Sequence, residues 1–272
     1  AVLQRMLGLR QEPHTPIVAI VSRLVSHKGL DLICEVLHDM MELPIQLVVL
    51  GKGDRKYEEF FHWAAQQHSG RMAVRLDYNE DLSMAIYAGA DLFLMPSKSE
   101  PCGLSQMIAM RYGTVPIVRE TGGLKDTVQP YESWRDSGNG FTFTNYASGD
   151  MLYVIREAVY LYKDYPDVFG RLRQRAMQCD FSWARSAREY LGIYAGITGR
   201  HWPVAGSAET SAAGENAPEA VEAFAVKNVA PEAAEAVHAE HAAPKDAPAA
   251  EEAVPETARR PAVKESAVKP KA

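Results

Sequence analysis

The sequence has 272 residues and a formal net charge of −6 at pH 7, from 35 Asp and Glu against 29 Lys and Arg. Most of this imbalance lies after residue 204, where 12 acidic and 7 basic residues occur, so residues 1–204 are almost neutral. A neutral domain without basic runs argues against nucleic-acid binding, because that affinity depends on neutralising phosphates. The sequence also has no apolar run long enough to cross a membrane.

The composition changes sharply near residue 204. Residues 205–272 contain no Leu, Ile, Met, Cys, Tyr or Trp, and Phe224 is their only aromatic residue. Such a segment cannot bury enough apolar surface to offset the entropy lost on ordering. We therefore predict one folded domain over residues 1–200 and a disordered tail rich in Ala, Pro, Glu and Lys over residues 204–272.

The cysteines and histidines argue against a metal site. Cys34, Cys102 and Cys179 are too few and too scattered for a disulfide framework or a metal cluster, which favours a reducing, cytoplasmic compartment. The eight histidines form no metal-ligand spacing, so we expect no metal and no cofactor. The chain starts at Ala1 without a secretion signal pattern, and we expect a piece of a longer cytoplasmic protein.

The predicted elements alternate between strands and helices from residue 16 to residue 146. Short apolar runs predict strands at residues 17–22, 47–50, 72–76, 91–95, 115–118 and 140–143. Apolar residues at helical spacing predict helices over residues 29–41 and 57–68, and mostly helical packing over residues 149–197. Continuous apolar strands alternating with helices predict an α/β fold, a Rossmann-like parallel sheet with helices on both faces.

Two cations lie in the turn that follows the first predicted strand. Arg23 stands at the carboxyl end of that strand, and Lys28 stands just before the next helix. Both can converge on a diphosphate in the crevice above a parallel sheet. Two solvated surface charges are the alternative, but the strand–turn–helix context favours the anion site.

A lone carboxylate lies in a later turn between a strand and a helix. Glu100 is placed to accept hydrogen bonds from sugar hydroxyls, although a helix cap is the alternative role. Pro101 suits the first positions of a helix, which we expect to run to Gly113, and Gly103 lets backbone amides approach an anion. Cys102 lies in the same predicted site, without a catalytic role.

Two further segments are candidates for ligand contact. Thr121 is a possible N-cap, and the glycines that follow it, Gly122 and Gly123, serve equally well for tight helix packing or for contact with a ligand. Tyr78 follows the third predicted strand, and its ring offers a surface on which a purine base could stack. A plain surface aromatic is the alternative for Tyr78.

Four ordered motifs together resemble the C-terminal, donor-binding domain of bacterial glycogen and starch synthases. They occupy residues 22–31, 96–106, 112–118 and 119–128, and the resemblance extends over about residues 1–197. It implies the C-terminal half of a glycosyltransferase-B fold. It also implies a metal-independent, retaining glucosyltransferase that moves glucose from ADP-glucose to the non-reducing end of an α-1,4-glucan. Ile108, eight residues after Glu100, fits the glycogen synthase branch, since broader relatives often have a second glutamate there.

The resemblance also implies roles for single residues. Arg23 and Lys28 would hold the distal phosphate of the donor and neutralise the leaving diphosphate, while Glu100 would hold glucose hydroxyls. The backbone amides of residues 103–105 would support the phosphates, and the ring of Tyr78 would lie against the base. The predicted nucleotide-sugar-binding residues are Tyr78, Cys102, Gly103, Leu104, Ser105, Thr121 and Gly122.

The family's N-terminal acceptor domain has no counterpart in this sequence. Because the active site of the family lies between its two halves, we expect the isolated chain to fold and to bind nucleotide weakly, but not to turn over. The same residues leave open a second function. It is a non-catalytic nucleotide-sugar-binding or scaffold protein that uses the tail to recruit a partner.

Overall fold

A computed structural model describes residues 1–199 of the chain. The chain divides into two units, Ala1–Val204 and Ala205–Ala272, and all described residues belong to the first. The predicted disordered tail lies outside the described residues. No helix within residues 1–199 is both long enough and apolar enough to cross a membrane.

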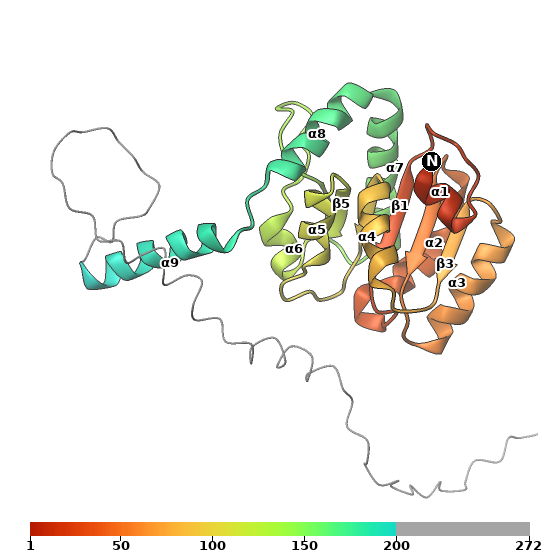
Figure 1. The fold of residues 1–272 in the computed structure, drawn as a ribbon, viewed down its shortest axis with the longest axis horizontal. Coiled ribbons are helices and arrows are strands. Elements are labelled where there is room, and N and C mark those ends of the chain that lie inside the picture. The colour runs from red at the N-terminus through yellow and green to blue at the C-terminus, as the bar shows by residue number, and fades with distance from the viewer. Residues whose placement is uncertain (200–272) are drawn as a thin grey trace, which may run out of the picture. The chain divides into compact units, whose positions relative to one another are not determined.

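Six parallel strands form one sheet in the order β3-β2-β1-β4-β5-β6. Figure 1 shows the ribbon of the domain, with β1, β3 and β5 labelled. The strands are β1 (Ile17–Val21), β2 (Gln46–Leu50), β3 (Met72–Arg75), β4 (Leu92–Met95), β5 (Val115–Arg119) and β6 (Phe141–Phe143). Each lies within one residue of its predicted bounds. The strands are buried almost throughout, as expected for a parallel sheet covered on both faces. The predicted α/β fold is therefore confirmed.

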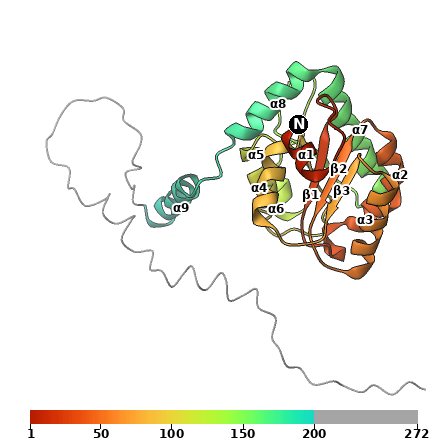
Figure 2. The same cartoon turned by 45° about the vertical axis from the view of Figure 1, so that its right-hand side comes forward.

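Helices cover both faces of this sheet (Figure 2). They are α1 (Val2–Leu7), α2 (Leu30–Glu42), α3 (Arg55–Gln67), α4 (Glu80–Gly89), α5 (Ser105–Arg111), α6 (Gly122–Thr127), α7 (Ser148–Asp164), α8 (Pro166–Gln178) and α9 (Trp183–Thr198), with a 3-10 turn, η1 (Ser26–Lys28), before α2. One core joins α2, α3 and α7 to the sheet, and a second joins α1, α4, α5 and α6 to its other face. Side chains alternate between these cores along each strand: Val18 of β1 faces the first core and Ala19 faces the second.

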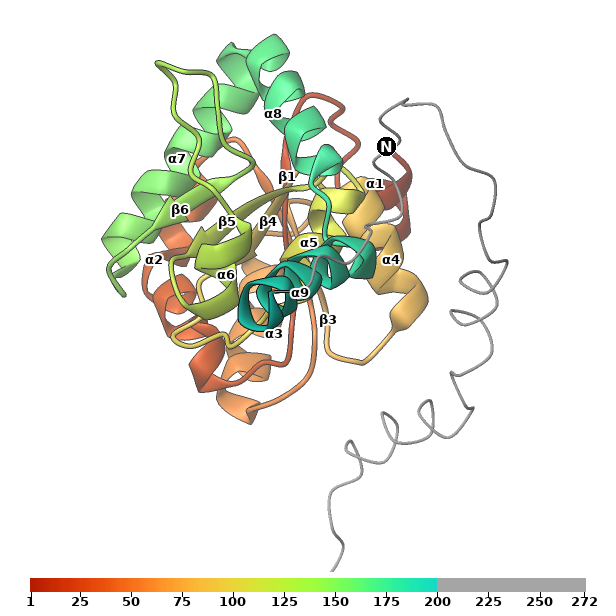
Figure 3. The same cartoon turned by 90° about the vertical axis from the view of Figure 1, so that its left-hand side faces the viewer.

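The strand order reverses direction between β1 and β4, which are neighbours in the sheet, as Figure 3 shows. In a doubly wound sheet this switch point opens a crevice at the carboxyl ends of the strands, where ligands bind. Here the crevice lies between the turn after β1 and the loop after β4. These segments touch directly, because the amide of Lys98 donates to the carbonyl of His27 at 2.9 Å. Gly29 is needed at this contact, since a Cβ there would lie 1.9 Å from the carbonyl oxygen of Pro96.

Two local predictions need correction. The helix after Glu100 begins at Ser105 and not at Pro101, because Gly103 adopts a left-handed φ of 71° and interrupts the chain before the helix. The packing predicted for residues 149–197 holds for α7 and α8 but not for α9. Helix α9 buries none of its residues, because no other described element covers its apolar side chains.

Candidate functional site

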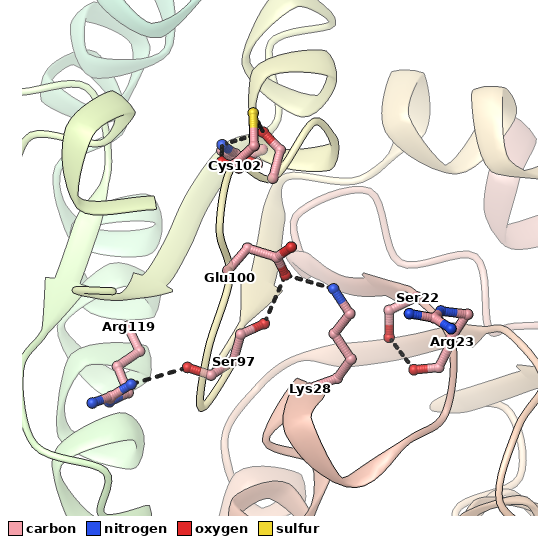
Figure 4. Close-up of polar contacts among 9 residues, drawn as sticks. Ser22, Arg23, Lys28, Ser97, Glu100, Cys102 and Arg119 are labelled. Atoms are coloured by element: carbon pink, nitrogen blue, oxygen red, sulfur yellow. Dashed lines mark hydrogen bonds and ion pairs between the residues drawn. The ribbon is translucent and has the colours of Figure 1, made fainter. Parts of the chain in front are cut away.

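Lys28 and Glu100 form an ion pair across the switch point (Figure 4). The Nζ atom of Lys28 lies 2.5 Å from Oε2 of Glu100, and the two side chains are only 18% and 11% exposed. The hydroxyl of Ser97 donates to the same oxygen at 3.2 Å. Limited solvent access strengthens this attraction. Both contacts end on Oε2, which leaves Oε1 of Glu100 as the acceptor open to a ligand.

Arg23 supplies a second cation beside this pair (Figure 4). Arg23 is the second residue after the end of β1, and its side chain is exposed to solvent. Within residues 1–199, its guanidinium makes no hydrogen bond or ion pair with another side chain. An exposed arginine without a protein partner keeps all its donors for an anion, whose charge and planar oxygens suit the guanidinium.

A cavity of about 450 Å³ opens next to Arg23. The turns after β1, β2 and β3 line it together with the starts of α4 and α5, and it is of a size that holds small ligands. It brings together Arg23, Tyr78 and Ser105, which were predicted to belong to one site. The ring of Tyr78 is 90% exposed, so its π-face is free for stacking. Lys52 adds a further cation to the lining.

The segment that follows Glu100 has a conformation set by glycine. Gly103 turns the chain in the left-handed region, with Leu104 in the N-cap position of α5. The Leu104 side chain is 64% exposed and lines a different cavity, next to Phe181. Cys102 is an exposed free thiol close to the start of α5. The structure therefore places Ser105 in the cavity of Arg23, but it places the side chain of Leu104 elsewhere.

The glycine pair at the start of α6 packs backbone against backbone on the Glu100 loop. A Cβ on Gly122 would lie 2.1 Å from the carbonyl oxygen of Glu100, and one on Gly123 would lie 2.0 Å from that of Cys102. The amide of Gly123 also donates to the carbonyl of Glu100 at 3.1 Å. Thr121 occupies the N-cap position of α6, although its side chain makes no capping bond. These contacts favour the packing alternative, and direct ligand contact by Thr121 and Gly122 stays a prediction.

Several residues at the site were not assigned from the sequence. Ser97, whose hydroxyl donates to Glu100, lies in the motif of residues 96–106, and its position three residues before Glu100 could have indicated the contact. Lys52 follows β2 just as Arg23 follows β1, so its place after a strand was a second signal. Arg119 donates to the carbonyl of Ser97 from the far side of the loop, and nothing local in the sequence indicates that contact.

The positive charge of the site comes from side chains. Within the part of the chain that the structure describes, no group of three or more His, Cys, Asp and Glu side chains is placed to hold a metal ion. Arg23 and Lys52 line the cavity, and Lys28 is paired with Glu100 beside it. Together with one buried carboxylate and an adjacent cavity, they can hold a ligand that carries both phosphates and hydroxyls.

Comparison with known proteins defines the class. A family model described as "Glycosyl transferases group 1" matches residues 9–165. The chain belongs to this family of glycosyltransferases.

Individual relatives narrow the resemblance. Over 192 residues the chain is 54% identical to the glycogen synthase of Geobacillus thermodenitrificans, covering 71% of this chain and 39% of the relative. It is 51% identical over 192 residues to the glycogen synthase of Desulfitobacterium hafniense, covering 71% of this chain and 41% of the relative. Among solved structures, the catalytic domain of starch synthase IV from Arabidopsis thaliana, bound to ADP and acarbose, resembles it with a TM-score of 0.66 and 38% identity, covering 73% of this chain and 42% of that chain.

The resemblance to the C-terminal domain of glycogen and starch synthases is thereby confirmed. The same comparisons support the glycosyltransferase-B type of fold. The chain spans about two fifths of the length of the curated relatives it matches.

Proposed function

We propose that this chain is the donor-binding half of a glycogen or starch synthase. The reaction is the transfer of glucose from ADP-glucose to the non-reducing end of an α-1,4-glucan, with retention of configuration and without a metal or cofactor. One observation carries the proposal. Two cations and a buried carboxylate, Arg23, Lys28 and Glu100, come from neighbouring turns at the switch point of the sheet, beside a cavity of about 450 Å³. The three free cysteines support a cytoplasmic location.

The charges suit the chemistry of glycosyl transfer from a nucleotide diphosphate. When the bond between the glucose C1 and the diphosphate breaks, negative charge grows on the leaving ADP. Arg23 and Lys28 neutralise that charge, and a cation placed where charge develops stabilises the transition state. Glu100 accepts hydrogen bonds from the glucose hydroxyls through the oxygen that faces the ligand. The backbone amides of residues 103–105 and the ring of Tyr78 support the phosphates and the base.

In the site without donor, Lys28 and Glu100 are paired with each other. Each group neutralises the other while the crevice holds no donor. Donor binding replaces this ion pair with two contacts to the ligand. Lys28 pairs with a phosphate, and Glu100 accepts hydrogen bonds from the sugar hydroxyls. A carboxylate that is held in place by Ser97 before the donor arrives needs little reorganisation on binding.

The acceptor contacts belong to the part of the relatives that this chain does not cover. The matched region is 39% and 41% of the two glycogen synthases compared. We therefore expect the isolated chain to bind donor without turning it over. A chimaera that joins it to the remainder of the Geobacillus thermodenitrificans relative should transfer labelled glucose from ADP-glucose to glycogen, and the Glu100→Gln chimaera should lose that transfer.

Calorimetric titration of the purified chain with ADP, ADP-glucose and UDP tests the donor site. We expect saturable binding that prefers ADP over UDP. Arg23→Ala should weaken ADP binding by roughly tenfold or more, since a charge-assisted hydrogen bond contributes about 1.5–3 kcal/mol. Lys28→Ala should weaken it similarly.

Arg156→Ala is the matched control for these variants. Arg156 is an exposed arginine on α7 that makes no ion pair or side-chain hydrogen bond within residues 1–199, so its loss changes the net charge without touching the crevice. Unchanged ADP affinity in both site variants would remove Arg23 and Lys28 from the site. Absence of binding to a folded wild-type chain would contradict a donor site formed by this chain alone.

A further inference from the structure

Arg119, the last residue of β5, lies behind the loop that carries Glu100 (Figure 4). Its Nη1 atom donates to the carbonyl oxygens of Ser97 at 3.2 Å and of Lys98 at 2.9 Å. One guanidinium thus fixes two consecutive carbonyls just before Glu100. Residues 96–104 contain no helix or strand, so their position depends on such contacts. Arg119 points away from the crevice side of the loop, which separates it from the cations that face the ligand.

Tyr146 holds the guanidinium of Arg119 in turn. The guanidinium carbon lies 5.4 Å from the centroid of the Tyr146 ring, within the range of a cation–π contact. The Tyr146 hydroxyl donates to Oδ1 of Asp31 at 2.6 Å. Burial, together with this bond to Asp31, raises the pKa of Tyr146, so the phenol keeps the proton that it donates. Asp31 lies in the first turn of α2, three residues after Lys28.

These contacts join the two halves of the candidate site from behind. Asp31 belongs to the segment of Lys28, and Ser97 belongs to the segment of Glu100. Tyr146 and Arg119 connect them, and the bond from the Lys98 amide to the His27 carbonyl connects them a second time. The spacing between Lys28 and Glu100 is therefore set by residues outside the crevice. We call Arg119 and Tyr146 the rear brace.

We propose that Arg119 is a positioning residue for the glucose end of the donor, supported by Tyr146. Arg119 fixes the carbonyls of Ser97 and Lys98, which places the Ser97 hydroxyl against Glu100 and aims the carboxylate at the sugar. This role rests on the proposed function of Glu100 as the sugar ligand. Arginine suits the task because its planar group has several donors in a fixed arrangement. Groups that bind a reacting substrate must be held within about 0.5 Å of their productive position.

A matched pair of variants separates this role from plain stability. Arg119→Met removes the donors and keeps the aliphatic part of the side chain. Arg71→Met is the control, because Nη2 of Arg71 also donates to two carbonyls, those of Leu43 and Ile45 at 2.5 and 3.3 Å, away from the crevice. Both residues are half-buried. Each variant therefore loses the same kind of contact, but only Arg119→Met loses it at the Glu100 loop.

The first readout is the ratio of ADP-glucose affinity to ADP affinity, measured by calorimetry. We expect Arg119→Met to lower this ratio about fivefold or more while ADP affinity changes less than about twofold, because Arg119 acts on the sugar ligand and not on the phosphates. Arg71→Met should leave the ratio unchanged, and Arg119→Lys should recover part of it. An unchanged ratio in folded Arg119→Met would overturn the proposal.

The second readout needs no ligand. Hydrogen exchange of the amides in residues 97–104 should become faster in Arg119→Met and stay as in the wild type in Arg71→Met. The reason is that Arg119 holds the loop of Glu100, whereas Arg71 holds the segment of Leu43 and Ile45. If the wild-type chain binds neither ADP nor ADP-glucose, the proposed donor site is wrong. The exchange measurement then tests by itself whether Arg119 holds the Glu100 loop. Unchanged exchange in Arg119→Met overturns it, and faster exchange confined to this loop supports it.

Discussion

At the scale of single residues, Lys28 and Arg23 are different kinds of cation. Lys28 is paired with a carboxylate that is 11% exposed, whereas Arg23 has no side-chain partner among the described residues. Removing one member of a largely buried ion pair leaves the other charge uncompensated, which costs stability as well as function. Arg23→Ala should therefore weaken binding with little effect on unfolding, while Lys28→Ala should affect both. Arg23→Ala is the cleaner probe of the phosphate site.

The cysteines should differ strongly in reactivity. Burial, with a smaller effect of Asp31, raises the pKa of Cys34 to about 11, so at pH 8 only about one thiol in a thousand is thiolate. Cys102 is exposed and free. Iodoacetamide at pH 8, followed by peptide mass mapping, should modify Cys102 well before Cys34, and ADP-glucose should slow the reaction of Cys102. Equal rates for the two cysteines would contradict the burial assigned to Cys34.

Site residues that closely follow a strand in the sequence could be predicted. Residues that contact the site from distant parts of the sequence could not. Arg23, Lys28 and Glu100 follow apolar runs, so topology alone places them at one edge of the sheet. The brace joins Arg119 to Ser97 across 22 residues and Tyr146 to Asp31 across 115. No local pattern encodes such pairs. Their contacts become visible only when the chain is folded.

At the scale of elements, the short helices were harder to predict than the strands. Most of each strand is a run of apolar residues, which a pattern detects well. The short helices α1 and α6, with six residues each, span too few turns to show a period, and α4 has only Ile86 and Tyr87 buried. Neither α1 nor α4 was predicted, and α6 was indicated only by Thr121 as a possible N-cap. The predicted start of α5 was wrong. Pro101 suggested the first turn of a helix, but the left-handed backbone at Gly103 delays the helix until Ser105.

Two glycine-to-alanine changes should have opposite effects on stability. Gly123→Ala places a Cβ 2.0 Å from the Cys102 carbonyl oxygen, so α6 or the Glu100 loop must shift. We expect a loss of about 1–3 kcal/mol in the free energy of unfolding, as for overpacking. Gly170→Ala in α8 meets no atom within 4 Å and should add about 0.5–1 kcal/mol. Urea denaturation measures both, and a stabilising Gly123→Ala would refute the close packing of this pair.

The loop between α6 and β6 should contribute stability that depends on pH. Asp136 has a φ of 46° and is paired with Arg171 and Arg175. The hydrogen bond from Arg171 lowers the pKa of Asp136 most, with a further contribution from Arg175. A lowered folded-state pKa means that the stability is present above the unfolded pKa of about 3.9 and is lost as the pH falls through the folded pKa.

Asp136→Asn tests this pH dependence. Asn tolerates a positive φ as Asp does, so the backbone conformation is kept while the charge is removed. The wild type should unfold at higher urea concentration than the variant at pH 6, and the difference should shrink below about pH 4. Asp167→Asn is the control, because Asp167 lies in the first turn of α8 and makes no ion pair with a described residue. A difference that grows toward low pH would contradict the assigned sign.

At the scale of the whole molecule, the described residues bury apolar surface on both faces of one sheet. The first core gathers α2, α3 and α7 with Phe169 and Leu172 of α8, and the second gathers α1, α4, α5 and α6. Helix α9 belongs to neither core. Cys179, just after α8, still packs against the second core. Residues 1–182 therefore contain the packing that holds the crevice residues in place. The stability of their fold should be independent of α9.

Truncation measures this independence. An isolated helix of 16 residues is marginal in water, and α9 leaves Trp183 88% and Ile197 76% exposed. A chain of residues 1–182 should unfold at the same urea concentration as a chain of residues 1–199, within about 0.5 kcal/mol, because no buried contact is lost. A chain ending at residue 165 should lose at least about 4 kcal/mol in the free energy of unfolding, since the buried Phe169 and Leu172 are removed.

Hydrogen exchange gives a second measurement. Amides of α9 should exchange far faster than those of α8 in the full chain. If residues 1–182 unfold at clearly lower urea than residues 1–199, α9 packs on the domain in solution, and its apolar residues stabilise the donor half directly.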